Sequence, residues 1–511
     1  MAQESRVKKT LLNARVNLFF YFIALTLSFF SRKIFLDNLG ADFIGLTGSI
    51  GSLLGFLNLA ELGIGAAIGY VLYKPLFDQD HQKINEIISV FGYLYRWVGL
   101  FILLGGLILA GFFPLIYPNT GFDYGIIYFA YFSFLFSSLI GYFVNYRQTL
   151  LGADQRNYVV TAYFQTASLI KTLIQMALAY YTGSYYLWVL VEFVFGILYA
   201  IILNWKINQV YPWLKTDVRS GKELRKKYPE IIKYTKQLFV HKFAGFVYWQ
   251  ISPLLIYTFS SLQTVAYYGN YTLITQKVES LLNNFLGSSA AGVGNLIAEG
   301  NRDNVLKVYW ELMVIRFIMI GIIVFSTYKL LPAFVTLWLG YEYVLPNSVL
   351  VLSLLIFFMS SIRGTTDQFI LGYGLFYDIW APIVEAMINI ILSIAGGALW
   401  GLEGILLGNI VSTILIVYGW KPYFLFVKGI NVSLLNYWKE FLKYIAIFAF
   451  SLIIVDKLLV SVAVSYKIYD DWFDWIIYAA IITIMFAIIY ILFFLLFTSS
   501  ARSVFLRLIK R

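Results

Sequence analysis

The sequence contains no cysteine, and its 511 residues include only two histidines, His81 and His241. The lack of cysteine excludes disulfide bonds, thiol catalysis and cysteine-ligated metals. Two histidines are also too few for the usual histidine-rich metal sites, so no metal cofactor is expected. Charged residues make up only 13% of the chain, whereas a soluble domain carries roughly 25%. This shortage of charge argues against an ordinary soluble protein.

Hydrophobic residues make up 60% of the chain, and apolar runs of about 20 residues recur along it. These continuous runs predict an all-α integral membrane protein with about fourteen transmembrane helices. A β-barrel would instead show short segments of alternating polarity. No cleavage site follows the first apolar run, which is therefore expected to be a span. The predicted spans are 12–31, 43–73, 87–114, 124–144, 158–182, 184–205, 238–260, 267–298, 308–330, 344–372, 380–400, 404–423, 440–460 and 475–498.

The distribution of the 38 Lys and Arg residues predicts the orientation. If the N-terminus is cytoplasmic, most of them lie at cytoplasmic ends of the spans, as the positive-inside rule requires. Both termini are then cytoplasmic. The net charge of +11 follows from this topology and does not predict nucleic-acid binding. The basic clusters either contact anionic lipid headgroups or recruit a cytoplasmic partner. Few basic residues fall on the outer side: Arg32, Lys33, Lys329, Lys457 and Lys467.

Short similarities at corresponding spans predict an internal repeat. Residues 148–152 (QTLLG) close the fourth span and 368–372 (QFILG) close the tenth, while 65–69 (GAAIG) and 289–294 (SAAGVG) lie in the second and eighth. We expect two six-helix bundles in parallel orientation, a plan that in transporters places substrate between the halves and alternates access to it. The predicted divisions are a bundle at 1–205, a basic cytoplasmic linker at 206–237, a bundle at 238–430, and two further helices with a basic tail at 431–511.

Several segments carry a family resemblance. They are 31–40 (SRKIFLDNLG), 58–67 (NLAELGIGAA), 73–77 (YKPLF), 268–271 (YGNY), 374–378 (GLFYD), 382–386 (PIVEA) with Asn389, and 401–408 (GLEGILLG). In this order they resemble the Wzx-type polysaccharide flippases of bacteria, within the multidrug/oligosaccharidyl-lipid/polysaccharide (MOP) exporter superfamily that also holds the MATE transporters. The resemblance covers the first twelve spans and implies the V-shaped, two-bundle fold of that superfamily.

The resemblance implies that the chain is not an enzyme but a flippase of the bacterial cytoplasmic (inner) membrane. Its substrate would be an undecaprenyl-diphosphate-linked oligosaccharide for O-antigen, lipopolysaccharide, capsule or exopolysaccharide synthesis. Membrane lipids, a polysaccharide polymerase and a chain-length regulator are the other implied partners. The alternatives are a MATE-type multidrug or cation antiporter, a lipid II flippase, and a non-transporting assembly scaffold. A glycosyltransferase is not expected, because the longest loop carries no Asp-x-Asp motif.

Cations inside the spans are candidate ligands for the diphosphate, because a charge at membrane depth costs roughly 2.5–3.5 kcal/mol. Lys171 in the fifth span either lines a substrate cavity or forms an internal ion pair. Lys277 in the eighth span meets either a diphosphate or a carboxylate. Arg32 binds substrate or anchors the first span at the interface. Arg316 lies within reach of the cytoplasmic interface, and we expect it to snorkel there.

Acidic residues inside the spans are candidates for coupling to an H⁺ or Na⁺ gradient. Glu61 lies near the centre of the second span, and Glu279 holds a similar position in the eighth. Each either binds a cation reversibly or remains a neutral, hydrogen-bonded acid. Arg363 and Asp367 are spaced i, i+4 and share a helix face, so we expect them to pair and to serve gating or structure more than ligand contact.

Overall fold

The structure is a computed structural model that describes residues 6–57, 64–118, 120–154, 156–287, 293–294, 296–297, 299–375, 377–463 and 467–509. Helices account for nearly all of these residues, and none of them lies in a strand. The chain forms two compact units, Met1–Ala266 and Tyr267–Arg511. Helix α12 (Leu262–Gly287) begins in the first unit and continues in the second.

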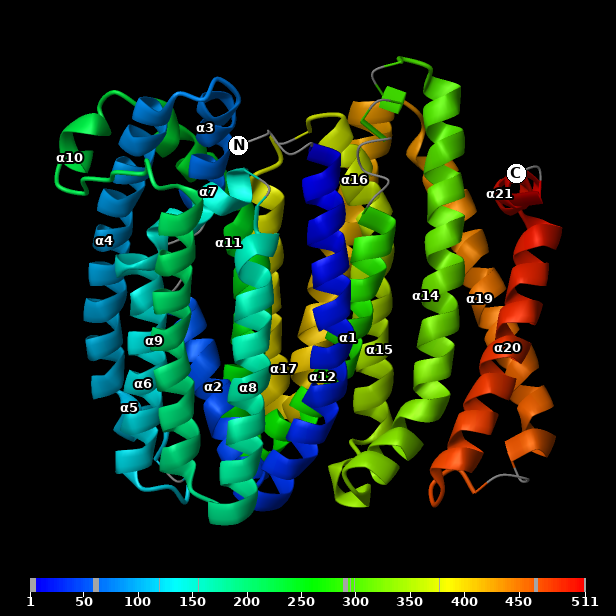
Figure 1. Cartoon of the computed structure of the whole chain (residues 1–511). Helices are drawn as coiled ribbons and strands as arrows, with labels where there is room; N and C mark the ends of the chain where they lie inside the picture. The colour runs from blue at the N-terminus through cyan, green and yellow to red at the C-terminus, as the bar shows by residue number, and fades with distance from the viewer. Residues whose placement is uncertain are drawn as a thin grey trace. The chain divides into compact units, whose positions relative to one another are not determined.

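The first unit consists of long helices joined by short connections (Figure 1). Its elements are α1 (Arg6–Leu39), α2 (Ala41–Leu57), α3 (Ile64–Phe77), α4 (His81–Gly111), α5 (Phe113–Ile116), α6 (Tyr124–Phe143), the 3₁₀ turn η2 (Asn145–Arg147), α7 (Gln148–Ala153), α8 (Tyr158–Thr182), α9 (Tyr185–Val210), α10 (Gly221–Leu224) and α11 (Pro229–Phe259).

Neighbouring helices of the first unit pack closely along their lengths. Helix α8 lies between α1 and α9, α6 contacts α9 and α4, and α11 packs against α2 and α3. Gly45 in α2 approaches the backbone of Leu262 so closely that a Cβ at Gly45 would lie 1.9 Å from the Leu262 carbonyl oxygen. The hydroxyls of Ser49 and Tyr117 are 2.7 Å apart in the same interior. Small residues and satisfied hydroxyls thus allow close helix packing, as expected in a membrane protein.

The second unit has the same general construction (Figure 1). Its elements are α14 (Arg302–Trp338), the 3₁₀ turn η3 (Tyr341–Tyr343), α15 (Asn347–Ile362), α16 (Gly364–Gly372), α17 (Trp380–Thr413), the π-helix η4 (Ile414–Trp420), α18 (Lys421–Tyr423), the π-helix η5 (Phe424–Ile430), α19 (Leu434–Ala463), α20 (Trp472–Phe497) and α21 (Ser499–Ile509). Helix α14 contacts α15 on one side and α20 on another.

The C-terminal helices pack tightly on the second unit. Helices α19 and α20 contact each other, and α20 lies along α14. Gly321 makes room for the ring of Tyr490, which would lie 2.5 Å from a Cβ at position 321. The Tyr490 hydroxyl donates a hydrogen bond of 3.2 Å to the carbonyl of Phe317. This pair of helices is therefore built into the second unit rather than attached to its surface.

Within the described residues, eight helical segments are long and apolar enough to cross a membrane. They are Phe19–Leu39, His81–Gly111, Tyr124–Phe143, Tyr185–Val210, Arg302–Trp338, Asn347–Gly372, Trp380–Ile430 and Trp472–Phe497. Other predicted spans, such as those of α8 and α12, are helical but carry more polar residues. The prediction of an all-helical integral membrane protein is confirmed. The division at residues 205, 238 and 430 stays a prediction.

A sharp turn divides α17 into two antiparallel helices. Gly401 adopts the left-handed φ of 57°, which glycine reaches without steric strain. Beyond the turn the two helices are in backbone contact, since a Cβ at Gly404 would lie 1.9 Å from the carbonyl oxygen of Gly396. The predicted spans 380–400 and 404–423 are therefore separated where the sequence indicated.

Candidate functional site

A cluster of charged side chains lies inside the second unit, where α15 meets α16. Arg363 is the residue between the two helices, and Asp367 follows one turn later in α16. The Nε of Arg363 donates to Oδ2 of Asp367 at 3.0 Å. The predicted i, i+4 pair is therefore present.

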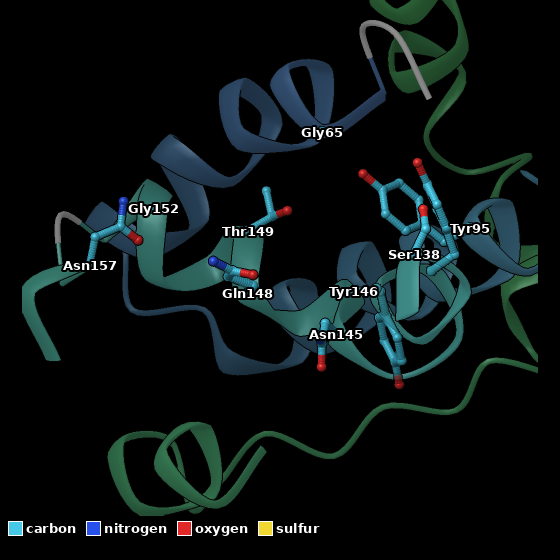
Figure 2. A pocket seen from close by; sticks show the side chains of 11 residues that line it. Gly65, Tyr95, Ser138, Asn145, Tyr146, Gln148, Thr149, Gly152 and Asn157 are labelled. Carbon is cyan, nitrogen blue, oxygen red and sulfur yellow. The ribbon is translucent and has the colours of Figure 1, made fainter. Parts of the chain in front are cut away.

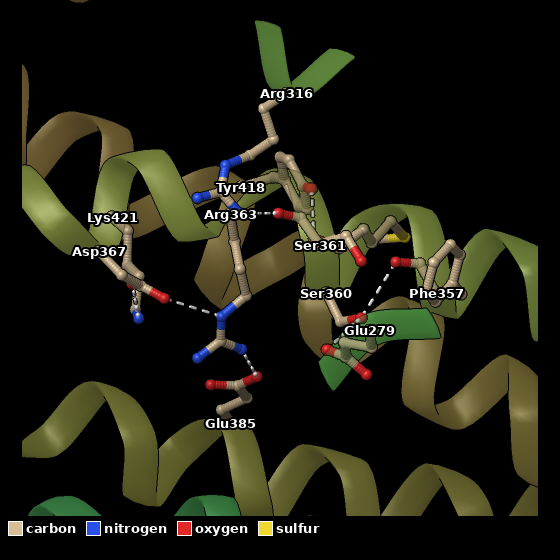
Figure 3. A network of polar contacts seen from close by, with 11 residues as sticks. Glu279, Arg316, Phe357, Ser360, Ser361, Arg363, Asp367, Glu385, Tyr418 and Lys421 are labelled. Carbon is tan, nitrogen blue, oxygen red and sulfur yellow. Dashed lines mark hydrogen bonds and ion pairs between the residues drawn. The ribbon is translucent and has the colours of Figure 1, made fainter. Parts of the chain in front are cut away.

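Two residues from distant parts of the chain complete the cluster (Figure 3). Lys421 donates from Nζ to Oδ1 of Asp367 at 2.5 Å, so each oxygen of this carboxylate faces one cation. Glu385 in α17 places Oε1 3.8 Å from Nη1 of Arg363. The side chain of Arg363 extends from Asp367 toward Glu385. The result is a chain of alternating charges, Lys421–Asp367–Arg363–Glu385.

Lys421 owes its position to an irregular stretch of backbone. Pro422 lacks an N–H and cannot continue an α-helical hydrogen-bond ladder, and π-helical turns lie on both sides of it. The preceding turn is held in place by Tyr418, whose hydroxyl donates to the carbonyl of Met359 at 2.8 Å. Trp420 is fixed by a hydrogen bond from Nε1 to Asp378 at 3.3 Å. Such π-helical insertions occur frequently at functional sites.

Arg316 from α14 lies beside the cluster and is only 3% exposed. Its Nε donates to the hydroxyl of Thr365 at 3.0 Å, and its Nη1 donates to the carbonyl of Ser361 at 2.8 Å. Gly364 makes this possible, because a Cβ there would lie 2.5 Å from Nη1 of Arg316. The expectation that Arg316 snorkels to the interface is therefore wrong. A glycine on a neighbouring helix and neutral oxygen acceptors hold the guanidinium inside the unit.

Glu279 and Lys277 lie on α12 within the second unit. Oε1 of Glu279 accepts a hydrogen bond from the Ser360 hydroxyl at 3.3 Å, which ties α12 to α15 close to Arg363. Lys277 is half-buried. The predicted roles of these two residues, substrate binding for Lys277 and ion coupling for Glu279, stay predictions.

The first unit holds a separate ion pair. Lys171 in α8 donates from Nζ to Oε1 of Glu192 in α9 at 2.6 Å. The other oxygen of Glu192 accepts from Nε2 of Gln175 at 3.1 Å. Of the two alternatives for Lys171, the structure shows the internal ion pair. A role in substrate binding would require Lys171 to leave Glu192.

Arg32 and Glu61 are the remaining candidates of the first unit. Arg32 donates from Nη2 to the carbonyl of Ala266 at 2.9 Å, and its neighbour Lys33 lies 3.3 Å from Asp37. The guanidinium of Arg32 is thus hydrogen-bonded to a backbone carbonyl, and its role in substrate binding or as an interface anchor stays a prediction. Glu61 lies outside the described residues, so its proposed coupling role stays a prediction.

The cations of the cluster could exchange their carboxylate partners for another anion. Arg363 and Lys421 are held by carboxylates, and a diphosphate offers the same kind of oxygen acceptor, with arginine well suited to bidentate contact. Protonation of Glu385 or Asp367 would free a cation in the same way. Sequence analysis identified Arg363 and Asp367 and missed Lys421. The signal for Lys421 was a Lys-Pro pair at the end of an apolar run.

Comparison with known proteins supports the fold. No family model matches the chain, and no curated protein matches its sequence. The structure of the lipid II flippase MurJ in an inward closed conformation aligns with a TM-score of 0.63 and 15% identity, covering 94% of this chain and 98% of that one. An inward-facing multidrug resistance MATE family transporter of the MOP superfamily aligns with a TM-score of 0.55 and 15% identity, covering 80% and 97%.

A third structure is a MOP superfamily transporter from Pyrococcus furiosus, described as having a binding pocket of reverse polarity. It aligns with a TM-score of 0.50 and 14% identity, covering 80% of this chain and 95% of that one. The apolar helices and these likenesses together define the class: the chain is an integral membrane protein with the fold of MOP-superfamily transporters.

Proposed function

We propose that this protein is a flippase that moves an undecaprenyl-diphosphate-linked oligosaccharide from the cytoplasmic to the outer leaflet of a bacterial inner membrane. The glycan would serve O-antigen, capsule or exopolysaccharide synthesis. Both termini would be cytoplasmic, and access to the two leaflets would alternate. A proton or sodium gradient would drive the cycle.

The observation that carries the proposal is the extent of the likeness to the lipid II flippase. That structure covers 94% of this chain, against 80% for the MATE family transporter. The additional coverage is what we expect if the lipid II flippase, unlike the MATE family transporter, has helices that correspond to α19 and α20. A protein that flips one lipid-linked saccharide is a closer functional model than a drug exporter. The sequence resemblance to Wzx-type flippases points to the same class of substrate.

The chemistry of the charged cluster supports the same substrate. A lipid diphosphate is anionic, and Arg363 and Lys421 present cationic donors within the unit. Carboxylates neutralise both cations, which offsets the desolvation cost of placing them inside an apolar protein. A substrate anion would replace these carboxylates as the partner of each cation. The carboxylates released in this exchange, Asp367 and Glu385, are candidates for binding the coupling cation.

The experiment is a translocation assay in proteoliposomes. The liposomes contain the full-length protein and a fluorescent undecaprenyl-diphosphate oligosaccharide, and a glycan-modifying enzyme outside reports the exposed fraction. Protein-dependent movement that accelerates under an imposed proton or sodium gradient is the expected result. No movement with several glycans, together with gradient-driven efflux of a cationic dye, would replace the flippase with a multidrug antiporter.

Matched variants test the cluster. Arg363→Gln and Lys421→Gln should each slow translocation at least tenfold while the protein still reaches the membrane. Lys443→Gln is the control, because Lys443 pairs with Glu440 three residues away on α19 and lies outside the cluster. Equal rates for all three variants would contradict a role for the cluster in transport.

A further inference from the structure

A cavity of about 560 Å³ lies within the first unit, among α3, α4, α6 and α7 (Figure 2). It is distinct from the charged cluster, which belongs wholly to the second unit. Pockets of ~300–1,000 Å³ are typical of small-molecule sites. We infer that this cavity is a carbohydrate subsite that binds uncharged sugar rings of the substrate's glycan. The inference deepens the proposed function and depends on it for the class of substrate.

The lining of the cavity has the composition that binds neutral sugars. It includes the rings of Tyr95, Tyr142 and Tyr146 and the carboxamides of Asn145, Gln148 and Asn157. Among the described residues that line it, none is charged. Carboxamides both donate and accept hydrogen bonds, as adjacent sugar hydroxyls require. Tyrosine combines an apolar ring face with a polar tip. A diphosphate, by contrast, would find no cation among these described lining residues.

The backbone around the cavity is firmly held. Between α6 and α7 the chain forms the 3₁₀ turn η2, and this turn carries Asn145 and Tyr146. Arg147 of the same turn donates from Nη1 to Oδ1 of Asn208 at 2.9 Å and also contacts Asn204 on α9. The Tyr146 hydroxyl lies 2.9 Å from that of Thr216. A preorganised wall of this kind lowers the entropic cost of binding.

Polar groups are distributed along the cavity. In Figure 2, Tyr95 and Ser138 lie together on one side, Gln148 and Thr149 lie near the middle, and Asn157 lies at the other end. This spread suits more than one sugar unit. Helices α3 and α7, which contribute to the cavity, lie at the same end of the first unit as α10 in the basic loop (Figure 1). Under the proposed topology this is the cytoplasmic end, where the substrate is collected.

Gly141 offers a direct way to fill the cavity. It lines the cavity on α6, and no atom lies within 4 Å of a Cβ built at that position. The Cβ of Gly141→Leu is therefore free of close contacts, so the added side chain starts in open space. Gly111→Leu is the matched control, because Gly111 is also a helical glycine of the first unit with no atom within 4 Å of its Cβ, and it does not line the cavity. Gln148→Leu is a second variant. The Gln148 side chain is exposed, and leucine has a similar size but lacks the carboxamide.

The test measures sugar binding apart from transport. Saturation-transfer NMR would be recorded on the detergent-purified full-length protein with N,N′-diacetylchitobiose and a neutral hexose trisaccharide. We expect a signal from at least one sugar with the wild type and Gly111→Leu, and at least a fivefold loss with Gly141→Leu and Gln148→Leu. Inorganic diphosphate should not displace the sugar.

Three outcomes would overturn the subsite: no sugar signal with the wild type, a signal that Gly141→Leu leaves unchanged, or displacement by diphosphate. Sugar binding that depends on the cavity, in a protein that moves no lipid-linked glycan in liposomes, would defeat the proposed function and keep the subsite. Normal translocation of a neutral glycan by Gly141→Leu would overturn the subsite and leave the proposed flippase function in place.

Discussion

Asp367 is the residue whose replacement should disturb the charged cluster most. It accepts hydrogen bonds from two cations, Arg363 at 3.0 Å and Lys421 at 2.5 Å. Each charged hydrogen bond contributes about 1.5–3 kcal/mol. The Asp367 side chain keeps 34% of its exposure, so water screens part of both. We therefore expect Asp367→Asn to lower the free energy of unfolding by about 2–4 kcal/mol.

A double-mutant cycle isolates the bond to Lys421. Lys421→Met keeps the apolar stem and removes the charge, at a cost of about 1.5–3 kcal/mol. The hydrogen bond between Asp367 and Lys421 is lost in either single variant. The double variant Asp367→Asn/Lys421→Met should therefore lower the free energy of unfolding by about 1–3 kcal/mol less than the sum of the two single variants. The measurement is denaturant unfolding of the purified protein in mixed detergent micelles, followed by tryptophan fluorescence.

The control cycle uses Lys443 and Glu440 on α19, whose atoms lie at a similar distance, 2.9 Å. These residues are one helical turn apart on the same helix, and ion pairs at this spacing contribute about 0.2–0.5 kcal/mol, so their coupling should stay below about 0.5 kcal/mol. If the Asp367–Lys421 cycle gave additive costs, the two side chains would be independent. The reasoning that treats the cluster as one coupled unit would then be refuted.

Three other perturbations address separate parts of the chain. Lys171→Ala should abolish polymer export in cells, with the protein still in the membrane, if Lys171 leaves Glu192 to meet substrate; export at the normal level would leave the ion pair a purely structural role. Gly404→Leu should prevent the hairpin in α17 from closing on Gly396 and lower the yield of folded protein on size-exclusion chromatography, an effect absent if the helices can separate freely. Glu61→Gln should remove the dependence of transport on pH or sodium, and an unchanged dependence would show that Glu61 does not couple the cycle.

The hydroxyl of Tyr228, at the end of the basic loop, is expected to stay protonated at physiological pH. Burial and the neighbouring carboxylate of Glu86 raise the pKa of Tyr228 above its usual value. Its hydroxyl therefore remains protonated through the physiological range and donates to Glu86 at 2.6 Å. Lys227 contacts the same carboxylate oxygen at 2.6 Å. This corner of the first unit should therefore keep its structure over the same range of pH.

Helices were predictable because the bilayer sets their length and polarity. The apolar runs of 87–114 and 475–498 correspond to α4 and α20, and their ends follow from nearby polar residues such as Asp80 and Asp471, which cap the helices. The span expected at 344–372 is divided at Arg363 into α15 and α16. Hydropathy does not register such a division, because Asn347–Gly372 is still apolar enough as a whole to count as one span, although α16 is more polar than α15.

The site was predictable only where its parts are close in sequence. Arg363 and Asp367 could be paired from i, i+4 spacing alone. Lys421 and Glu385 reach them through a π-helical stretch and a helix hairpin, and neither geometry follows from composition. Arg316 illustrates the same difficulty, because its burial depends on the missing side chain of Gly364 on another helix. Long-range packing of this kind is what a single sequence leaves undetermined.

The neutralised state of the cluster bears on how a flippase could both bind and release an anion. Exposed cations in an apolar unit would be costly without substrate and would hold a diphosphate too firmly with it. Here Asp367 accepts hydrogen bonds from both Arg363 and Lys421. In the proposed flippase, a bound diphosphate would replace one set of charge-assisted bonds by another, which would keep the net change in free energy small. A small net change permits release on the far side, and protonation or cation binding at the displaced carboxylates would bias the exchange in one direction.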